Sequence, residues 1–227
     1  MDVIRLPRRT EDLGPRQIQQ INRLRRPLID DRGSPQHATN RRVKQAMADG
    51  LVAAGAGRVL DWGCGYHPLR PFLPGDVEYA AVDLDSEVVA ENRTQGLVCH
   101  HPDDALLEFD GRPFDAVVSV FVFHFRLPAA HVDAMAGLGS FVLANVYRRD
   151  EASRSRLARA FGRRGLEVTR EQDPARAATG HEFWFIAGRD VTGKLAGKVL
   201  DTVAQSMQSQ GLTGFGTAPP KRRSRLA

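Results

Sequence analysis

The stretch "RVLDWGCGYHPLRPFL", residues 58–73, decides the fold of this chain. An apolar run reaches Asp61, and Gly63 and Gly65 follow, as in a turn that brings backbone close to a ligand. A dinucleotide loop of the form G-x-G-x-x-G would have a third glycine at position 68. Pro68 stands there instead and removes a backbone N–H donor. The stretch therefore predicts a strand and a nucleotide-binding turn that is not built around a pyrophosphate.

Short apolar runs alternate with helical or loop segments from residue 58 onward. The runs are "RVLDWG", "VEYAAVDLD", "GLVCHH", "FDAVVSVFVF" and "SFVLANVY", followed by "LEVTRE" and "EFWFIAGR". The segment "QDPARAATGH" between the last two runs is too short for a crossover helix, so these two should pair antiparallel. The pattern predicts an α/β fold: a doubly wound, seven-stranded, mostly parallel sheet with an antiparallel C-terminal hairpin and helices on both faces.

Helical patterns flank this region and suggest four segments. Residues 14–26 predict an amphipathic helix that ends before Pro27, and Thr39 or Asn40 is expected to cap a second helix. Residues 1–39 are thus a basic, helical N-terminal extension and a candidate lid, and residues 40–190 are the ligand-binding domain. A helix is expected within 191–217, and 218–227 reads as a disordered basic tail.

The net charge of +5 is concentrated in the two arms of the chain. Residues 1–50 hold 11 Lys and Arg against 6 Asp and Glu, and residues 218–227 hold 4 against none. Such arms suit an anionic partner such as nucleic acid, although arginine-rich tails can also simply keep a protein in solution.

Other features of the sequence narrow the class of protein. With no long apolar segment and charges throughout the first ten residues, we expect no membrane association and a cytoplasmic location. Cys64 and Cys99 form no CxxC or Cys/His cluster, so neither a disulfide framework nor a zinc site is indicated. The oligomeric state is left open.

An acidic residue after the second strand indicates the cofactor. Asp83 lies 18 positions beyond Gly65, the spacing at which a carboxylate accepts hydrogen bonds from ribose hydroxyls. Asp61, before the loop, would repel phosphates but attract a positively charged amino-acid tail. S-adenosylmethionine combines such a tail with an adenosine and carries no phosphate.

The chain resembles the class I S-adenosylmethionine-dependent methyltransferases over about residues 40–190. "VLDWGCG" resembles the glycine motif of that family, with His67 in place of its last glycine. "AAVDLD" resembles the ribose motif, "HHPDDALLEF" the segment whose acidic side chain, here Asp103 or Asp104, reaches the adenine amino group, and "FDAVVSVFVFHF" the fourth-strand motif. The cofactor-binding residues that the resemblance implies are Asp61, Gly63, Cys64, Gly65, His67, Asp83, Leu84, Asp103, Asp104, Ala105, Ser119, Val120 and Phe121.

The acceptor side of the predicted site holds a histidine and arginines. His124 is the candidate general base, with a packing role as the alternative, and Arg126, Arg148 and Tyr147 are candidates for positioning the acceptor. Arg149 and Asn145 are further candidates there, Arg149 more readily as a solvated arginine. No Asn/Asp-Pro-Pro-aromatic tetrad and no acidic group at 121–123 is present, so neither DNA amine methylation nor a magnesium-dependent reaction is indicated.

Three hypotheses for the function follow. The first is metal-independent methyl transfer to an oxygen or nitrogen of a small, anionic metabolite. The second is RNA methylation, in which the basic arms contact phosphates. The third is a protein that binds S-adenosylmethionine for another chemistry. The sequence does not name the acceptor.

Overall fold

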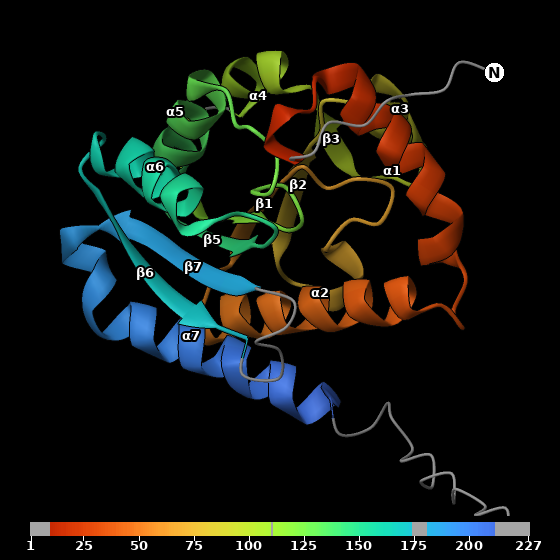
Figure 1. Ribbon diagram of the computed structural model, residues 1–227. Helices are drawn as coiled ribbons and strands as arrows, with labels where there is room; N and C mark the ends of the chain where they lie inside the picture. The colour runs from red at the N-terminus through yellow and green to blue at the C-terminus, as the bar shows by residue number, and fades with distance from the viewer. Residues whose placement is uncertain (1–9, 110, 174–180, 212–227) are drawn as a thin grey trace, which may run out of the picture.

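The computed structural model describes residues 10–109, 111–173 and 181–211, and it contains one seven-stranded sheet (Figure 1). The strand order is β3-β2-β1-β4-β5-β7-β6. The strands are β1 (Arg58–Trp62), β2 (Glu78–Val82), β3 (Val98–His100), β4 (Phe114–Ser119), β5 (Gly139–Val146), β6 (Leu166–Gln172) and β7 (Glu182–Gly188). Strands β1 to β5 run parallel, and β7 pairs antiparallel with both β5 and β6. The predicted fold class and terminal hairpin are confirmed.

Helices cover both faces of the sheet (Figure 1). The helices are α1 (Pro15–Asp30), α2 (Pro35–Ala54), α3 (Ser86–Thr94), α4 (Pro102–Glu108), α5 (Ala129–Leu138), α6 (Glu151–Gly162) and α7 (Arg189–Gly211), with short 3-10 helices at Thr10–Asp12 and Arg70–Phe72. Apolar residues of α2, α3 and α7 pack in one core cluster, and those of α4, α5 and α6 pack in the other.

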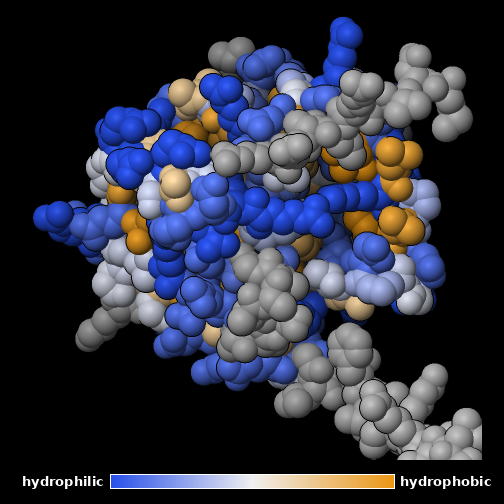
Figure 2. Space-filling view, viewed as in Figure 1, coloured by the Kyte–Doolittle hydropathy of each residue, from blue (hydrophilic) through white to orange (hydrophobic). Residues whose placement is uncertain are grey.

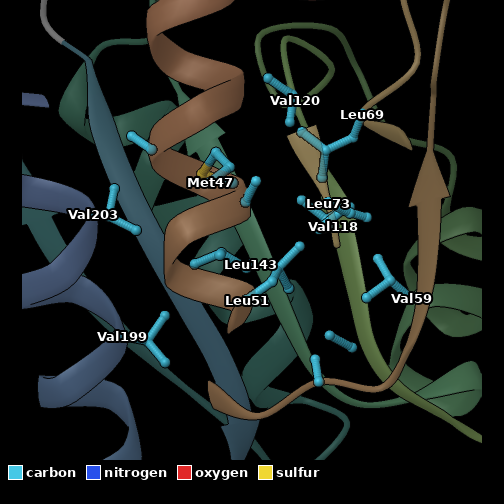
Figure 3. Close-up of a cluster of buried hydrophobic side chains, with 14 of the residues drawn as sticks. Met47, Leu51, Val59, Leu69, Leu73, Val118, Val120, Leu143, Val199 and Val203 are labelled. Carbon is cyan, nitrogen blue, oxygen red and sulfur yellow. The ribbon is translucent and has the colours of Figure 1, made fainter. Parts of the chain in front are cut away.

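Strand residues alternate between these two clusters because successive side chains of a strand point to opposite faces. In β5, for example, Leu143 belongs to the first cluster and Val142 to the second. Figure 3 shows the first cluster, where Met47 of α2 and Val203 of α7 lie near Leu143. Both faces of the sheet are therefore buried, which leaves the carboxyl ends of the parallel strands as the place for a site.

The two N-terminal helices begin and end differently from the prediction. Helix α1 continues through Pro27 to Asp30, because two residues beyond its end donate hydrogen bonds to its last turn. Asp31 N–H donates to the Pro27 carbonyl, and Ser34 Oγ donates to the Leu28 carbonyl. Helix α2 begins at Pro35, where the Ser34 hydroxyl accepts a hydrogen bond from His37 N–H at 2.9 Å. The prediction that Thr39 or Asn40 caps this helix was wrong, since Ser-Pro supplies a cap and a preset first turn.

The fourth strand is shorter than the apolar run predicted. β4 ends at Ser119, and the chain turns at Phe121, which has a φ of 60°. The following apolar residues form a buried loop rather than strand, with Phe123 and Phe125 packed inside the protein. The backbone conformation of Phe121 ends the strand. No glycine or proline at this point of the sequence predicts that end.

The C-terminal half otherwise follows the prediction. Helix α6 buries Leu157 and Phe161, and α7 spans Arg189–Gly211 with a kink at Gly193. Most of the predicted loop between β6 and β7 and the predicted basic tail lie outside the described residues. Among the helices that the structure describes, none combines the length and the apolar character that crossing a bilayer requires.

Candidate active site

A cavity of about 750 Å³ opens at the carboxyl ends of β1, β2, β4 and β5. Its floor is the loop after β1 and the ends of these strands, and α1 and the first half of α2 contribute the opposite wall. This is the edge of a doubly wound sheet at which ligands bind, because the strand order reverses between β1 and β4.

Backbone geometry explains the two glycines of the loop. Gly63 has a φ of 82°, and a Cβ built on it would lie 2.3 Å from Val122 Cγ2. Gly65 has a φ of 63°, and a Cβ there would meet nothing within 4 Å. Gly63 is therefore required by packing as well as conformation, whereas Gly65 leaves open space beside the cavity that it lines.

The carboxylate of Asp83 stands at the cavity floor. It accepts hydrogen bonds from Gly65 N–H and Asp85 N–H, both at 2.9 Å. Burial raises the pKa of Asp83 to about 6, so the group is mostly ionised at neutral pH. Each oxygen keeps a lone pair beyond its backbone bond, which leaves Asp83 able to accept hydrogen bonds from ligand hydroxyls.

Asp61 lies behind the loop rather than in the lining of the cavity. Its carboxylate accepts from Leu69 N–H at 2.8 Å and from the Tyr79 hydroxyl at 2.6 Å. Lys44 of α2 is buried, lines the cavity and interacts electrostatically with Asp61. Burial lowers the pKa of Lys44, while the negative charge of Asp61 opposes that shift. Of the two residues, Lys44 therefore faces the cavity, and Asp61 holds the loop in shape.

Aromatic rings enclose the other end of the cavity. The ring of Tyr147 stacks on His181 with centroids 4.8 Å apart, and Phe121 meets Tyr147 edge-on at 5.7 Å. The Tyr147 hydroxyl lies 3.2 Å from His124 Nε2, and His124 Nδ1 is buried without a hydrogen-bond partner among the described residues. Burial, with the positive charges of Arg25 and Arg148, lowers the pKa of His124 to about 2, so the ring is neutral at neutral pH.

Two residues of this end adopt left-handed backbone conformations without being glycine. Phe121 follows β4 with a φ of 60°, and Arg148 follows β5 with a φ of 54°. Asn145 of β5 fixes the first turn by accepting a hydrogen bond from Phe121 N–H at 2.6 Å. Such conformations cost about 1–2 kcal/mol per residue and cluster at functional sites, and both residues line the cavity.

The aromatic end carries an excess of positive charge. Arg25, Arg126 and Arg148 line it, and none of them has a carboxylate partner within the described ranges. Arg26 also lines the cavity but is paired with Glu91 at 2.5 and 2.8 Å. Of the described residues in the lining, Asp83 is the only carboxylate. An anion bound at the aromatic end would therefore face three uncompensated guanidinium groups.

Arg149, next in the chain, has a structural role. Its guanidinium donates to the carbonyls of Phe123 and Phe125 and to Glu11 Oε2, and the side chain is only 7% exposed. It thus fixes the loop after β4 and does not line the first cavity.

Helix α1 closes over the cavity through polar contacts. Arg23 pairs with Glu87 at 3.0 Å, and Gln19 donates to the Leu84 carbonyl at 3.4 Å. In the 3-10 helix before α1, Thr10 Oγ1 donates to the His124 carbonyl at 3.0 Å. No residue of α1 is buried, and Leu24 and Leu28 of this helix are exposed. Figure 2 shows apolar surface on the side where Figure 1 places α1. The helix is therefore held to the domain mainly by surface charges.

His67, which departs from the glycine motif, lies between the loop and α1. Its Nε2 atom is 3.3 Å from Asp30 Oδ1, without the geometry of a hydrogen bond, and the ring lines the cavity. Burial lowers the pKa of His67 to about 4, and Lys44 contributes to that shift. The ring is thus neutral at neutral pH and contacts the lid rather than turning away from the site.

The structure brings most of the predicted site residues to this cavity. The predicted residues in its lining are Gly63, Cys64, Gly65, His67, Asp83, Leu84, Val120, Phe121, His124, Arg126, Tyr147 and Arg148. Outside the lining are Asp61, Asp103, Asp104, Ala105 and Ser119. Asp103 and Asp104 are exposed on α4, Ala105 is buried in the core, and Ser119 donates to the Trp62 carbonyl at 2.9 Å. The adenine contact expected of Asp103 or Asp104 stays a prediction.

Sequence reasoning missed Arg25, Lys44 and His181, which line the cavity from α1, α2 and the start of β7. Lys44 had a detectable signal, because a lysine beside Val43, Ala46 and Met47 sits on the apolar face of an amphipathic helix. Neither Arg25 nor His181 has a local pattern of that kind. Among the residues that the structure describes, no group of three or more His, Cys, Asp and Glu side chains is placed to hold a metal ion.

Solved structures share this architecture. Magnesium protoporphyrin IX methyltransferase from Synechocystis PCC 6803, with bound SAH, aligns over 75% of this chain and 95% of its own, with 17% identity and a TM-score of 0.53. A TehB-like SAM-dependent methyltransferase from Corynebacterium glutamicum aligns over 78% and 100%, with 15% identity and a TM-score of 0.52. The chain has the class I methyltransferase fold. No protein-family model matches the sequence, and no curated protein does.

The class I methyltransferase fold accounts for the position of the cavity. The sheet of this chain, with its antiparallel β7, aligns with the two solved methyltransferase structures. The glycine loop follows β1, and Asp83 follows β2. At these identities the likeness concerns architecture, so the ligands of this chain must be argued from its own residues.

Proposed function

We propose that this chain is an S-adenosylmethionine-dependent methyltransferase that acts, without a metal, on an oxygen or nitrogen of a small anionic molecule. The observation that carries the proposal is the pairing of Gly65 and Asp83 at the floor of a large cavity on the carboxyl edge of this sheet. The arginines at the opposite end support an anionic acceptor.

The residues present fit S-adenosylmethionine. Asp83 offers acceptor lone pairs to ribose hydroxyls, and the space beside Gly65 admits a ligand close to the backbone. The Lys44 amine lines the cavity and can donate hydrogen bonds to the carboxylate of the amino-acid end. When bound, S-adenosylmethionine supplies an electrophilic methyl group. The side chains around it have to hold the acceptor in line and exclude water.

The aromatic end is suited to hold that acceptor. Phe121, Tyr147 and His181 form apolar walls, and Arg25 and Arg148 can bind a carboxylate or phosphate by paired N–H donors. An acceptor that is already an oxyanion needs no base. For a hydroxyl or ammonium acceptor, His124 is the nearest candidate base; burial is the main cause of its low pKa, and a bound anion would offset only the part that the guanidinium charges add.

Calorimetry with S-adenosylmethionine tests the cofactor site. The wild type is expected to bind, and Asp83→Ala should weaken binding about 100-fold, because two hydrogen bonds to a charged group are worth roughly 3 kcal/mol or more. Asp76→Ala removes an exposed carboxylate outside the cavity lining, at a position with no predicted ligand contact, and is the matched control. Thermal unfolding of both variants separates lost binding from lost folding. Absence of binding by the wild type would overturn the proposal.

Truncation after residue 217 separates a small acceptor from RNA. Methyl transfer to a small anionic acceptor, followed by release of S-adenosylhomocysteine, should be nearly unchanged without the basic tail. An RNA methyltransferase should instead lose affinity for its substrate, and its binding should weaken steeply with salt.

A further inference from the structure

A second cavity, of about 650 Å³, adjoins the first and is rich in arginine. It lies between the 3-10 helix Thr10–Asp12, the first turn of α5 and one side of α6. Strongly hydrophilic side chains gather in Figure 2 on the side where Figure 1 places α5 and α6. Its charged lining residues are Glu11, Asp12, Arg126, Arg149, Arg156, Arg163 and Arg164.

Two of the five arginines already have partners. Arg149 is bound by Glu11 and by backbone carbonyls, as described above. Arg164 pairs with Asp133 and donates to the Ala160 carbonyl at 2.6 Å. These two guanidinium groups fix the walls of the cavity, and their charges are largely compensated.

The other three arginines are available to a ligand. The guanidinium groups of Arg126 and Arg163 make no hydrogen bond or ion pair with the part of the chain that the structure describes. Arg156 is 56% exposed at its side chain and reaches Glu11 only at 4.0 Å. The first turn of α5 also faces the cavity at Ala129, and its N-cap residue, Pro128, supplies no side-chain cap. Three guanidinium groups and a helix amino end thus converge on one space.

The second cavity shares two lining residues with the first. Arg126 and Leu127 line both cavities. The two cavities therefore lie side by side, and a molecule with its reactive group beside Tyr147 would have to extend past Arg126 to place a second group between α5 and α6. A lone carboxylate would satisfy one guanidinium, whereas a phosphate or diphosphate group presents oxygens to several at once.

We propose that the second cavity binds a phosphate or diphosphate group carried by the acceptor molecule. That this group belongs to a methyl acceptor rests on the proposed function, but the anion site itself does not. Substrates would then be recognised at two places: the acceptor atom at the aromatic end of the first cavity, and the phosphate at Arg126, Arg156 and Arg163.

Titration of the full chain with inorganic pyrophosphate tests the site. The wild type is expected to bind, and the double variant Arg156→Gln/Arg163→Gln should bind at least about tenfold more weakly, because each lost charge-assisted hydrogen bond contributes a factor of that order. Arg159→Gln is the matched control, since Arg159 is exposed on α6 outside the cavity lining. No pyrophosphate binding, or equal weakening in the control, would overturn the proposal.

Arg126→Gln tests the link to the acceptor. Pyrophosphate affinity should fall at least about fivefold, because Arg126 stands where the two cavities meet. If Arg126→Gln leaves the affinity for pyrophosphate unchanged while the double variant loses affinity, the anion binds away from the first cavity. That result would overturn the proposal that one substrate is recognised in both cavities.

A single-stranded RNA oligonucleotide is the competing ligand. An RNA that follows the surface of α6 should lose affinity with Arg159→Gln as much as with the double variant. If the wild type binds RNA in this way and does not bind pyrophosphate, the phosphate site is overturned in favour of a nucleic-acid surface. Titration with S-adenosylhomocysteine is independent: pyrophosphate binding without cofactor binding would keep the anion site and overturn the proposed function.

Discussion

The two ends of the main cavity are built in different ways. The cofactor end consists of consecutive motifs, in which Gly63, Gly65 and Asp83 follow two neighbouring parallel strands. The acceptor end gathers Arg25, His124, Tyr147 and His181 from α1, the loop after β4, the end of β5 and the start of β7. The cofactor end depends on residues that are close together in the sequence. The acceptor end depends on residues that only tertiary packing brings together.

This difference indicates how each end tolerates change. At the proposed cofactor end the backbone of the glycine loop forms part of the surface, and a methyl group added at Gly63 would clash with Val122. At the acceptor end side chains form the surface, and the strained backbone of Phe121 and Arg148 holds them in place. Substitutions should therefore damage folding at the cofactor end and selectivity at the acceptor end.

The largest effect is expected at Gly63. In Gly63→Ala the left-handed φ costs about 1–2 kcal/mol, and the close approach to Val122 adds about 1–3 kcal/mol, for a loss of roughly 3 kcal/mol in the free energy of unfolding. Denaturant titration measures it. Gly65→Ala, which meets no neighbour within 4 Å, should lose only the conformational part, about 1–2 kcal/mol. Equal losses in the two variants would contradict the packing argument.

The pH dependence of cofactor affinity should follow Asp83. Its pKa of about 6 means that the carboxylate loses an acceptor lone pair as the pH falls through 6, so binding of S-adenosylhomocysteine should weaken about tenfold between pH 7.5 and 5. Asp83→Asn should flatten this profile. Because folding raises the pKa, the contribution of Asp83 to stability is full below its ordinary pKa and is lost as the pH rises through 6. A profile unaltered in the Asn variant would assign the titration to another group.

Relief of backbone strain at the acceptor end should have a smaller effect. Arg148→Gly removes a non-glycine residue from a φ of 54°, so the free energy of unfolding should stay unchanged or rise by up to about 1 kcal/mol. Arg163→Gly, at a residue with a φ of −63°, should instead lose about 0.5–1 kcal/mol. Affinity for S-adenosylhomocysteine should change less than twofold in Arg148→Gly. A clear loss of stability there would mean that the arginine side chain, not its strained backbone, matters for folding.

The smallest effect concerns the lid. Arg23→Gln/Arg26→Gln removes ion pairs to Glu87 and Glu91, which are partly exposed and screened by salt. Amide hydrogen exchange in α1 should accelerate a few-fold at low salt and less at 0.5 M salt, with no change in the core strands. Arg16→Gln, at an exposed position of α1 with no ion pair to the described residues, is the control. Exchange rates equal to those of the wild type at low salt would show that apolar contacts hold the lid.

The sequence determined the sheet, its hairpin and the cofactor end, because strand periodicity, the two glycines and the spacing to Asp83 are local signals. Fold-level rules place such motifs at one edge, whatever the rest of the chain does. The early end of β4 was not predictable, since the φ of Phe121 is fixed by a hydrogen bond to Asn145, 24 positions away.

Only the tertiary structure decided which further residues complete the acceptor end, and only it shows the second cavity. Arg25 and His181 lie far from the predicted residue His124 in the chain, and nothing near them in the sequence marks them as its neighbours. The same holds for Arg126 and Arg163, which line one cavity because α5 and α6 pack on the same face of the sheet. Hydrophobic periodicity and turn residues depend on near neighbours along the chain. These sites depend instead on which faces of distant helices and strands pack against each other.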